Sequence, residues 1–99
     1  MIKKLMQIGL TKNEATVYIE LLQLGVTTVG GLEKNMSLYR QSLYNILNDL
    51  EAKGLIEITK RNNKKHFRAL DANLLLEEHK KKEKKIQHLI PDLYALSGS

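Results

Sequence analysis

The spacing of apolar residues changes at Gly54, and this change is what most limits how the chain can fold. Over roughly residues 39–53, apolar side chains recur in steps of three and four, the period of an amphipathic helix: Leu43, Ile46, Leu47 and Leu50. After Gly54, residues 55–59 and 66–69 alternate between apolar and polar, as strands do. Asn62 and Asn63 lie between these segments and tolerate the left-handed conformation of a tight turn, so we expect a β-hairpin.

Three shorter helical patterns precede residue 39. The first covers residues 2–8. The second begins at a capping box, because the Thr11 hydroxyl can accept from the backbone of Glu14 while the Glu14 carboxylate returns to the backbone of Thr11. The third is short and is capped by Thr27 or Thr28. A two-stranded hairpin is not stable alone, so we expect the helices to cover one of its faces.

The last segment predicts a long helix. Asp71 can cap a helix that runs from residue 72 to near residue 96, and Pro91 inside it predicts a kink or a break. Apolar residues lie on a seam of alternating three- and four-residue steps, which His79 and Lys82 interrupt: Leu75, Ile86, Leu89, Leu93 and Leu96. Such a seam can pack on the chain's own core or on a second copy, and we favour homodimerisation because a long exposed apolar stripe is a liability.

These elements define the expected fold class, which is mainly α with a small β-hairpin. Three helices followed by a hairpin is the element order of a winged helix-turn-helix. We therefore expect a winged helix-turn-helix DNA-binding domain over residues 1–70. We expect a C-terminal dimerisation helix within residues 71–99.

The positive charge is unevenly distributed. The formal net charge is +5, and acidic and basic residues balance up to Thr59, so the whole excess lies after it. It falls in two clusters, residues 60–68 and residues 80–85. A basic patch confined to part of a domain suggests a polyanionic partner, although a lysine-rich solvated surface is the simpler alternative. For residues 80–85 we favour a solvated helix face, with Glu77 and Glu78 pairing to Lys81 and Lys82 at four-residue spacing.

The helix over residues 39–53 is the candidate recognition helix, because the second helix of a helix-turn-helix enters the major groove of DNA. Arg40 can donate to guanine or to a phosphate, and Gln41 and Asn45 each offer the donor and acceptor that adenine requires. Any one of these side chains can instead be an ordinary surface residue. As a set, the predicted contacts are Tyr39, Arg40, Gln41, Tyr44, Asn45 and Asn48.

The hairpin supplies the second predicted contact surface, the wing. Five cations occur there within nine residues that contain no carboxylate, and we expect them to meet the phosphate backbone. A solvated turn is the alternative. The predicted wing contacts are Lys60, Arg61, Lys64, Lys65 and Arg68.

Other kinds of function find little support in the sequence. The chain has no cysteine, no apolar run long enough for a membrane span and no signal peptide pattern, which favours a cytoplasmic protein that does not bind membranes. Its three histidines, His66, His79 and His88, lack metal-site spacing with a carboxylate. No phosphate-binding glycine loop or nucleophile elbow is present. We predict no catalytic residues, no metal site and no cofactor, and the sequence points to no particular small-molecule effector.

The sequence also resembles the N-terminal DNA-binding domain of the TrmB family of transcriptional regulators. The resemblance rests on Leu10-Thr11-Lys12-Asn13-Glu14-Ala15-Thr16-Val17-Tyr18, Leu24-Gly25, Thr28-Val29, Arg40 with Leu43-Tyr44 and Leu47, Leu50-Glu51-Ala52-Lys53-Gly54-Leu55-Ile56 and Phe67-Arg68-Ala69. It departs from the family pattern at Tyr39, usually a small capping residue, and at Gly31, usually acidic. The resemblance implies DNA binding, a dimer and transcriptional control. Family members often carry a C-terminal sugar-sensing domain, and we expect a stand-alone winged helix-turn-helix without it.

Two hypotheses follow. The first is a transcriptional regulator that binds double-stranded DNA in a sequence-specific way as a homodimer. Its recognition helix would lie in the major groove and its wing on the phosphate backbone. The alternative is a winged-helix module for protein–protein interaction without sequence-specific DNA binding. An apolar or acidic recognition face would favour the alternative, whereas this sequence has a polar face and a basic wing.

Overall fold

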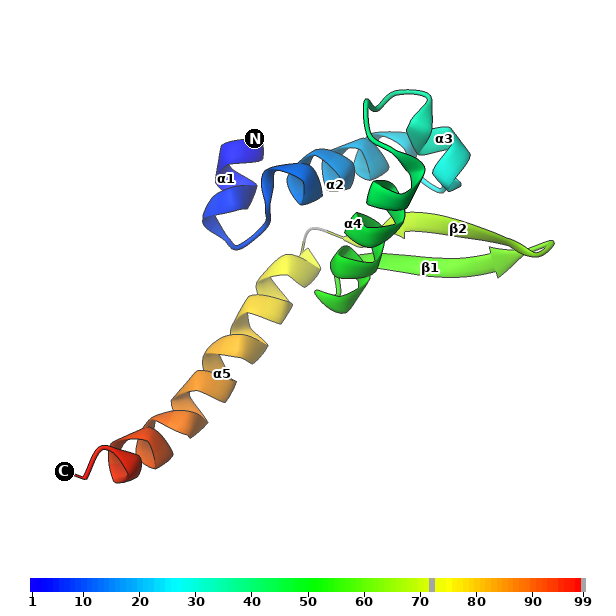
Figure 1. Cartoon of the computed structure of the whole chain (residues 1–99). Helices are drawn as coiled ribbons and strands as arrows, with labels where there is room; N and C mark the ends of the chain where they lie inside the picture. The colour runs from blue at the N-terminus through cyan, green and yellow to red at the C-terminus, as the bar shows by residue number, and fades with distance from the viewer. Residues whose placement is uncertain (72, 99) are drawn as a thin grey trace.

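The computed structural model describes residues 1–71 and 73–98, and in addition the side chain of Leu75 lies outside the described part. In chain order the elements are α1 (Ile2–Gln7), α2 (Lys12–Leu24), α3 (Val29–Glu33), α4 (Arg40–Ala52), β1 (Ile56–Arg61), β2 (Lys64–Ala69) and α5 (Asn73–Leu96). The predicted fold class is confirmed, since helices α1–α4 are followed by an antiparallel hairpin and a long helix. Figure 1 shows a body made of α1–α4 and the hairpin, from which α5 projects.

The start of α2 forms as its sequence predicts. The hydroxyl of Thr11 accepts from the Glu14 N–H at 3.1 Å, and Glu14 Oε1 accepts from the Thr11 N–H at 2.8 Å. The same carboxylate accepts from Lys53 Nζ at 2.7 Å. Lys53 caps the end of α4, so this buried carboxylate joins the first turn of α2 to the last turn of α4.

The core lies between the helices and the inner face of the hairpin. The apolar stripe of α4 is buried as predicted, and it packs with side chains from α2, α3 and the strands, among them Tyr18, Leu21, Leu32, Ile56 and Phe67. Thr28, rather than Thr27, caps α3 by accepting from the Gly31 N–H at 3.2 Å. Burial of this stripe fixes which face of α4 remains for a partner.

Thr27 has a role that its sequence context did not predict. Its backbone N–H donates to the Phe67 carbonyl at 3.0 Å, and the Phe67 N–H donates to the Thr27 carbonyl at 2.7 Å. This bridge pairs the segment before α3 with the outer edge of β2. The wing is thereby attached to the helix-turn-helix by backbone hydrogen bonds as well as by the apolar core.

Helix α5 covers Asn73–Leu96, and Asp71 Oδ1 accepts from the Asn73 N–H at 2.8 Å; residue 72, the predicted first residue of the helix, lies outside the described residues. Of the predicted kink or break at Pro91, the break is wrong, because the helix continues through this residue. Pro91 removes the hydrogen bond to the carbonyl of Gln87 and its ring crowds that carbonyl, but Gln87 is exposed, so water can satisfy the carbonyl. The molecule extends over 56 × 30 × 25 Å, and α5 forms its long arm (Figure 1). Within the described ranges, no helix is long and apolar enough to cross a membrane.

Candidate nucleic-acid interface

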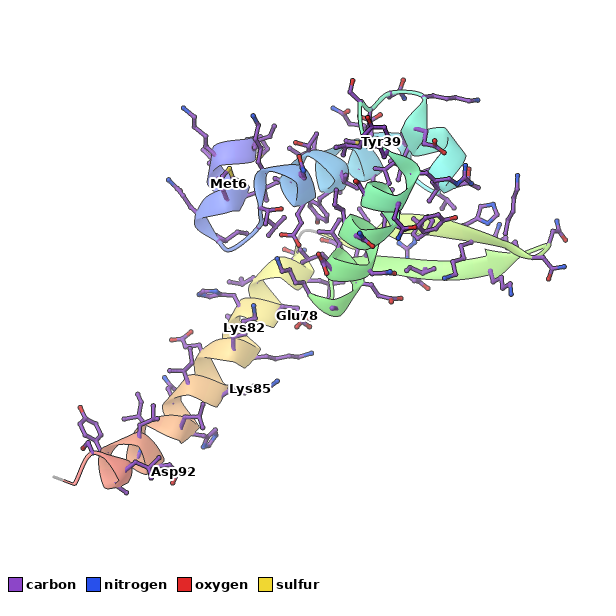
Figure 2. All side chains as sticks on the ribbon, viewed as in Figure 1. Met6, Tyr39, Glu78, Lys82, Lys85 and Asp92 are labelled. Carbon is purple, nitrogen blue, oxygen red and sulfur yellow. The ribbon has the colours of Figure 1, made fainter. Side chains whose placement is uncertain are left out.

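The polar face of α4 is exposed, as its sequence pattern predicts. Gln41, Asn45 and Asn48 all face solvent, opposite the buried stripe. Tyr39 is the N-cap, but its side chain makes no capping hydrogen bond and is 86% exposed. Figure 2 shows Tyr39 at the end of α4 that lies beside α3. Tyr44 is half-buried and packs against the core.

Arg40 is held by two neighbours that its sequence position did not indicate. Its Nη1 donates to Glu33 Oε1 at 2.7 Å, and its guanidinium carbon lies 6.0 Å from the centre of the Tyr44 ring. Glu33 is the last residue of α3, so this ion pair spans the turn of the helix-turn-helix. The Arg40 side chain remains 60% exposed, with Nη2 and Nε still able to donate to a partner.

Gln41 and Asn45 form a pair across one turn of α4. Gln41 Nε2 donates to Asn45 Oδ1 at 3.2 Å. The Oε1 acceptor of Gln41 and the Nδ2 donor of Asn45 therefore remain outside this bond. The two side chains together present one acceptor and one donor to an outside partner.

The wing is a two-residue hairpin whose register places like charges opposite each other. Asn62 and Asn63 have φ values of 51° and 62°, as the turn requires. Lys60 then lies opposite Lys65, and Arg61 lies opposite Lys64. Like charges that face each other across strands are destabilising, so the hairpin concentrates positive charge at a cost to its own stability.

Arg68, a predicted contact to the phosphate backbone, already has a partner within the hairpin. It lies opposite Glu57 in the hairpin, and its Nη2 forms an ion pair with the Glu57 carboxylate. The nine-residue window considered above contains no carboxylate, but the register brings one across from β1. A two-residue turn at Asn62–Asn63 fixes this register, so counting outward from the turn would have identified the pair.

A groove joins the helix-turn-helix to the wing. Its volume is about 520 Å³, and it lies between the start of α3, the first turns of α4 and the tip of the hairpin. Of the predicted contact residues, Arg40, Tyr44, Lys60, Lys64 and Lys65 line it. The structure therefore brings part of the predicted helix surface and part of the predicted wing surface together. Asn63, Thr28 and Gly30 also line the groove and were not predicted.

The remaining predicted residues lie outside the groove lining. Tyr39, Gln41, Asn45 and Asn48 continue the exposed surface of α4 beside it, while Arg61 and Arg68 are exposed on the hairpin. The start of α3 was not identified from sequence as part of the groove, although the predicted cap at Thr27 or Thr28 had indicated a helix beginning there. Glu33 has no comparable signal, because its role depends on the geometry of the turn.

Glu14 is the buried charged side chain of the described core. Burial acts to raise the pKa of Glu14, but the hydrogen bond from Lys53, the Thr11 N–H and the charge of Lys53 outweigh burial and hold the pKa below its usual value. Glu14 is therefore charged at neutral pH. It fixes the end of α4 opposite to the one that faces the groove.

The other basic cluster is arranged differently. Lys80, Lys84 and Lys85 are exposed along α5, and Lys81 Nζ donates to Glu78 Oε1 at 3.3 Å, a three-residue spacing instead of the expected four. The seam residues of the same helix are also exposed, at 57% for Ile86, 52% for Leu89, 57% for Leu93 and 84% for Leu96. The seam does not pack on the chain's own core at these positions. The predicted seam residue Leu75 has its side chain outside the described part.

In the part of the chain that the structure describes, no group of three or more His, Cys, Asp or Glu side chains could hold a metal ion. The arrangement is instead a polar helix beside a cationic wing. This fold defines a winged helix-turn-helix protein, the class that transcriptional regulators commonly use to meet DNA.

The comparisons with known proteins agree with this class. The family described as sugar-specific transcriptional regulator TrmB matches residues 5–73. The chain belongs to the TrmB family of transcriptional regulators, as the resemblance in its sequence indicated. A search of curated protein sequences gives no match.

Two solved structures share the fold. TrmBL2, described as an archaeal chromatin protein with a novel mode of DNA binding, superimposes with a TM-score of 0.84 at 20% identity, covering 99% of this chain and 39% of that chain. An ArsR-like transcriptional regulator from Rhodococcus sp. RHA1 superimposes with a TM-score of 0.62 at 22% identity, covering 98% of this chain and 90% of that chain. The family and both similar proteins belong with regulatory or chromatin proteins, not with enzymes.

Proposed function

We propose that this protein is a transcriptional regulator that binds double-stranded DNA at specific sequences. In this proposal α4 lies in the major groove and the wing lies on the phosphate backbone. The observation that carries it is the groove between α4 and the hairpin, where Arg40, Lys60, Lys64 and Lys65 converge. TrmBL2, which has the same fold, is described as binding DNA, and this supports DNA as the partner. A regulator of this family meets its DNA in the cytoplasm, where we expect this chain to act.

The first turns of α4 are the part that reads bases. The acceptor and donor left by the Gln41–Asn45 pair match the N6 and N7 groups that adenine presents in the major groove. Arg40 can meet guanine or a phosphate with the N–H groups that Glu33 leaves unoccupied. The Glu33 carboxylate limits the positions that the guanidinium can adopt, which reduces the entropy lost on binding.

The wing supplies affinity that does not depend on sequence. Each lysine that meets a phosphate releases counterions from the DNA. Binding also relieves the repulsion between Lys60 and Lys65, because a phosphate placed near both attracts both. Arg61 and Lys64 form the second facing pair and act in the same way.

A selection experiment tests the sequence-specific part of the proposal. Duplexes bound by the protein from a random pool should converge on one motif, which is then used for binding isotherms across a range of salt concentrations. The observed binding constant should fall steeply as salt rises. No preference for duplex DNA over a neutral polymer would contradict the proposal and favour a protein-binding module.

A pair of variants then tests the wing. Lys60→Gln/Lys65→Gln should lower the salt-dependence slope by about two and weaken all duplexes alike. Lys84→Gln/Lys85→Gln removes the same charge from the exposed face of α5 and serves as the matched control. Equal effects of the two double variants would show that net charge, and not the wing, sets the affinity.

We also propose that the exposed seam of α5 forms a homodimer. Two copies would bury Ile86, Leu89, Leu93 and Leu96 against each other and present two copies of α4 to one duplex. Half-sites would then be about one helical turn, or ~34 Å, apart. Sedimentation across a concentration range should show a monomer–dimer equilibrium that Leu89→Asp shifts to monomer. A seam variant that sediments like the wild type would contradict this interface.

A further inference from the structure

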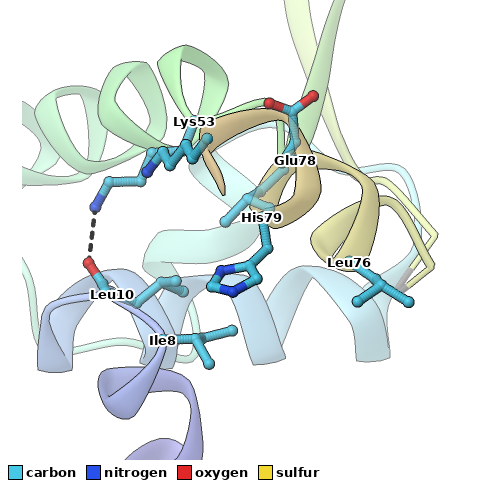
Figure 3. Close-up of a pocket in the computed structure, with 9 residues that line it drawn as sticks. Ile8, Leu10, Lys53, Leu76, Glu78 and His79 are labelled. Atoms are coloured by element: carbon cyan, nitrogen blue, oxygen red, sulfur yellow. Dashed lines mark hydrogen bonds between the residues drawn. The ribbon is translucent and has the colours of Figure 1, made fainter. Parts of the chain in front are cut away.

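A second cavity lies at the junction of the body and α5 (Figure 3). Its volume is about 350 Å³, which lies within the range of small-molecule sites. Ile8, Leu10 and Leu55 from the body form one side, and Leu76 from α5 forms the other. The walls are therefore largely aliphatic, and they come from three separated parts of the chain.

The polar groups of this cavity carry a net positive character. Lys53, Glu78, His79 and Lys82 line it. Two of these charges are already paired, because Lys53 Nζ donates to Glu14 Oε1 at 2.7 Å and Glu78 Oε1 accepts from Lys81 at 3.3 Å. Among the described residues Lys82 belongs to no ion pair, so its ammonium and the His79 ring are the groups left for a ligand.

The sequence of α5 has an unusual feature at this position. His79 and Lys82 interrupt the apolar seam that Ile86, Leu89 and Leu93 continue further along the helix. A helix that only dimerised would gain from apolar residues at both positions. In the structure these two polar residues line the cavity, so the interruption of the seam coincides with the place where the helix faces the body.

We propose that this cavity binds a small organic anion with an apolar body, such as an aromatic or short aliphatic carboxylate. The carboxylate lies at Lys82 and His79, and the apolar part lies against Ile8, Leu55 and Leu76. This combination of aliphatic walls and a few convergent polar groups is typical of small-ligand sites. A ligand held there touches both the body and α5. It therefore stabilises the orientation of α5 relative to the body in which the ligand makes the most contacts with both.

Binding is tested with benzoate as the probe, using chemical-shift changes of the full chain in solution. Benzoate should give saturable shifts at Ile8, Leu55 and Leu76. Benzamide, which lacks the charge, and acetate, which lacks the apolar ring, should each bind about tenfold more weakly or less. Lys82→Gln should weaken benzoate about tenfold, because it removes one charged hydrogen bond. Lys84→Gln, on the opposite face of α5, should leave the benzoate affinity unchanged.

Several outcomes would overturn the proposal. These are shifts that do not saturate, equal binding of benzoate and benzamide, or a Lys82→Gln variant that binds like the wild type with an unchanged far-ultraviolet circular dichroism spectrum. If a second copy of the chain fills the cavity instead, benzoate causes no shifts and Lys82→Gln changes the sedimentation behaviour. The proposal does not rest on DNA binding, since Lys60→Gln/Lys65→Gln should keep benzoate binding while losing DNA affinity.

Discussion

The body and α5 contain similar kinds of residue but use them in opposite ways. In the body, the apolar stripe of α4 is buried and the three lysines of the wing line one groove. On α5, both the apolar seam and the lysines are exposed, and Figure 2 shows Lys82, Lys85 and Asp92 along the projecting part of the helix. An apolar stripe alone therefore does not tell whether a helix completes its own domain or waits for a partner. The difference lies in whether other elements of the same chain cover the stripe.

The largest expected difference between the two regions concerns these apolar residues. Leu47→Ala should lower the free energy of unfolding by about 2–5 kcal/mol, because Leu47 is fully buried and its removal leaves a cavity. Leu93→Ala should change the unfolding of the monomer by less than about 0.5 kcal/mol, because Leu93 is exposed. Urea denaturation at low protein concentration measures both values.

The same pair of variants can break the comparison. If Leu93→Ala costs as much as Leu47→Ala at every protein concentration, then α5 packs on its own body in solution. A loss that appears only at high protein concentration, where dimers form, would instead sharpen the distinction between a core and an interface.

The next largest expected effect concerns how well the body discriminates between DNA sequences. Arg40→Ala should reduce the discrimination between the selected duplex and its mismatched variants by about 1–3 kcal/mol, because it removes the main side chain that can recognise guanine. Competition binding with single-base variants measures this loss. Lys85→Ala on α5 serves as the control and should have no effect on discrimination. An unchanged sequence preference in Arg40→Ala would mean that Arg40 contacts only phosphate.

Structure that depends on neighbouring residues could be predicted from the sequence, whereas pairs between distant residues could not. The capping box of Thr11 and Glu14 spans three residues, and the turn at Asn62–Asn63 depends on those residues alone. The pairing of Glu14 with Lys53 joins residues 39 positions apart. Nothing in the periodicity of either segment indicates that pairing, because it depends on how α2 and α4 cross.

The same distinction separates the features of the candidate site that could be predicted from those that could not. Exposure of Gln41, Asn45 and Asn48 followed from the apolar stripe on the opposite face of α4. The ion pair of Arg40 did not, because Glu33 lies on a different helix, whereas the pair of Arg68 with Glu57 follows once the register of the hairpin is counted from its turn. The helix does not break at Pro91, because an exposed carbonyl one turn earlier tolerates the loss of its donor.

A smaller effect compares two glutamates. The side chain of Glu14 is 5% exposed and pairs with Lys53, whereas that of Glu78 is 36% exposed and pairs with Lys81. Glu14→Gln keeps an acceptor for the capping box but loses the charge, so it should lower the free energy of unfolding at pH 7 by about 1 kcal/mol. Glu78→Gln should change it by less than about 0.5 kcal/mol, as exposed pairs do.

The pH dependence follows from the pKa of Glu14, which the hydrogen bond and charge of Lys53 hold below its ordinary value despite burial. The charged form is favoured by folding, so its contribution is fully present above the pKa of the unfolded chain and is lost as pH falls through the folded pKa. The difference between wild type and Glu14→Gln should therefore be constant near neutral pH and shrink in acid. A difference that persists unchanged into strong acid would show that the charge of Glu14 does not act through Lys53.

The smallest expected effect concerns the wing, whose facing lysines should lower the stability of the hairpin while they raise its affinity for DNA. Because Lys60 faces Lys65 across the strands, Lys60→Gln/Lys65→Gln should raise the free energy of unfolding in the absence of DNA by about 0.2–1 kcal/mol. Lys84→Gln/Lys85→Gln should leave stability nearly unchanged, because these side chains lie exposed on a projecting helix. Denaturation at low salt measures the gain, and added salt should reduce it by screening the repulsion.

A wing variant that is more stable yet binds DNA more weakly would show that the facing lysines are kept for a polyanion. A variant that loses stability would show that their aliphatic stems contribute more to the hairpin than their charges cost it.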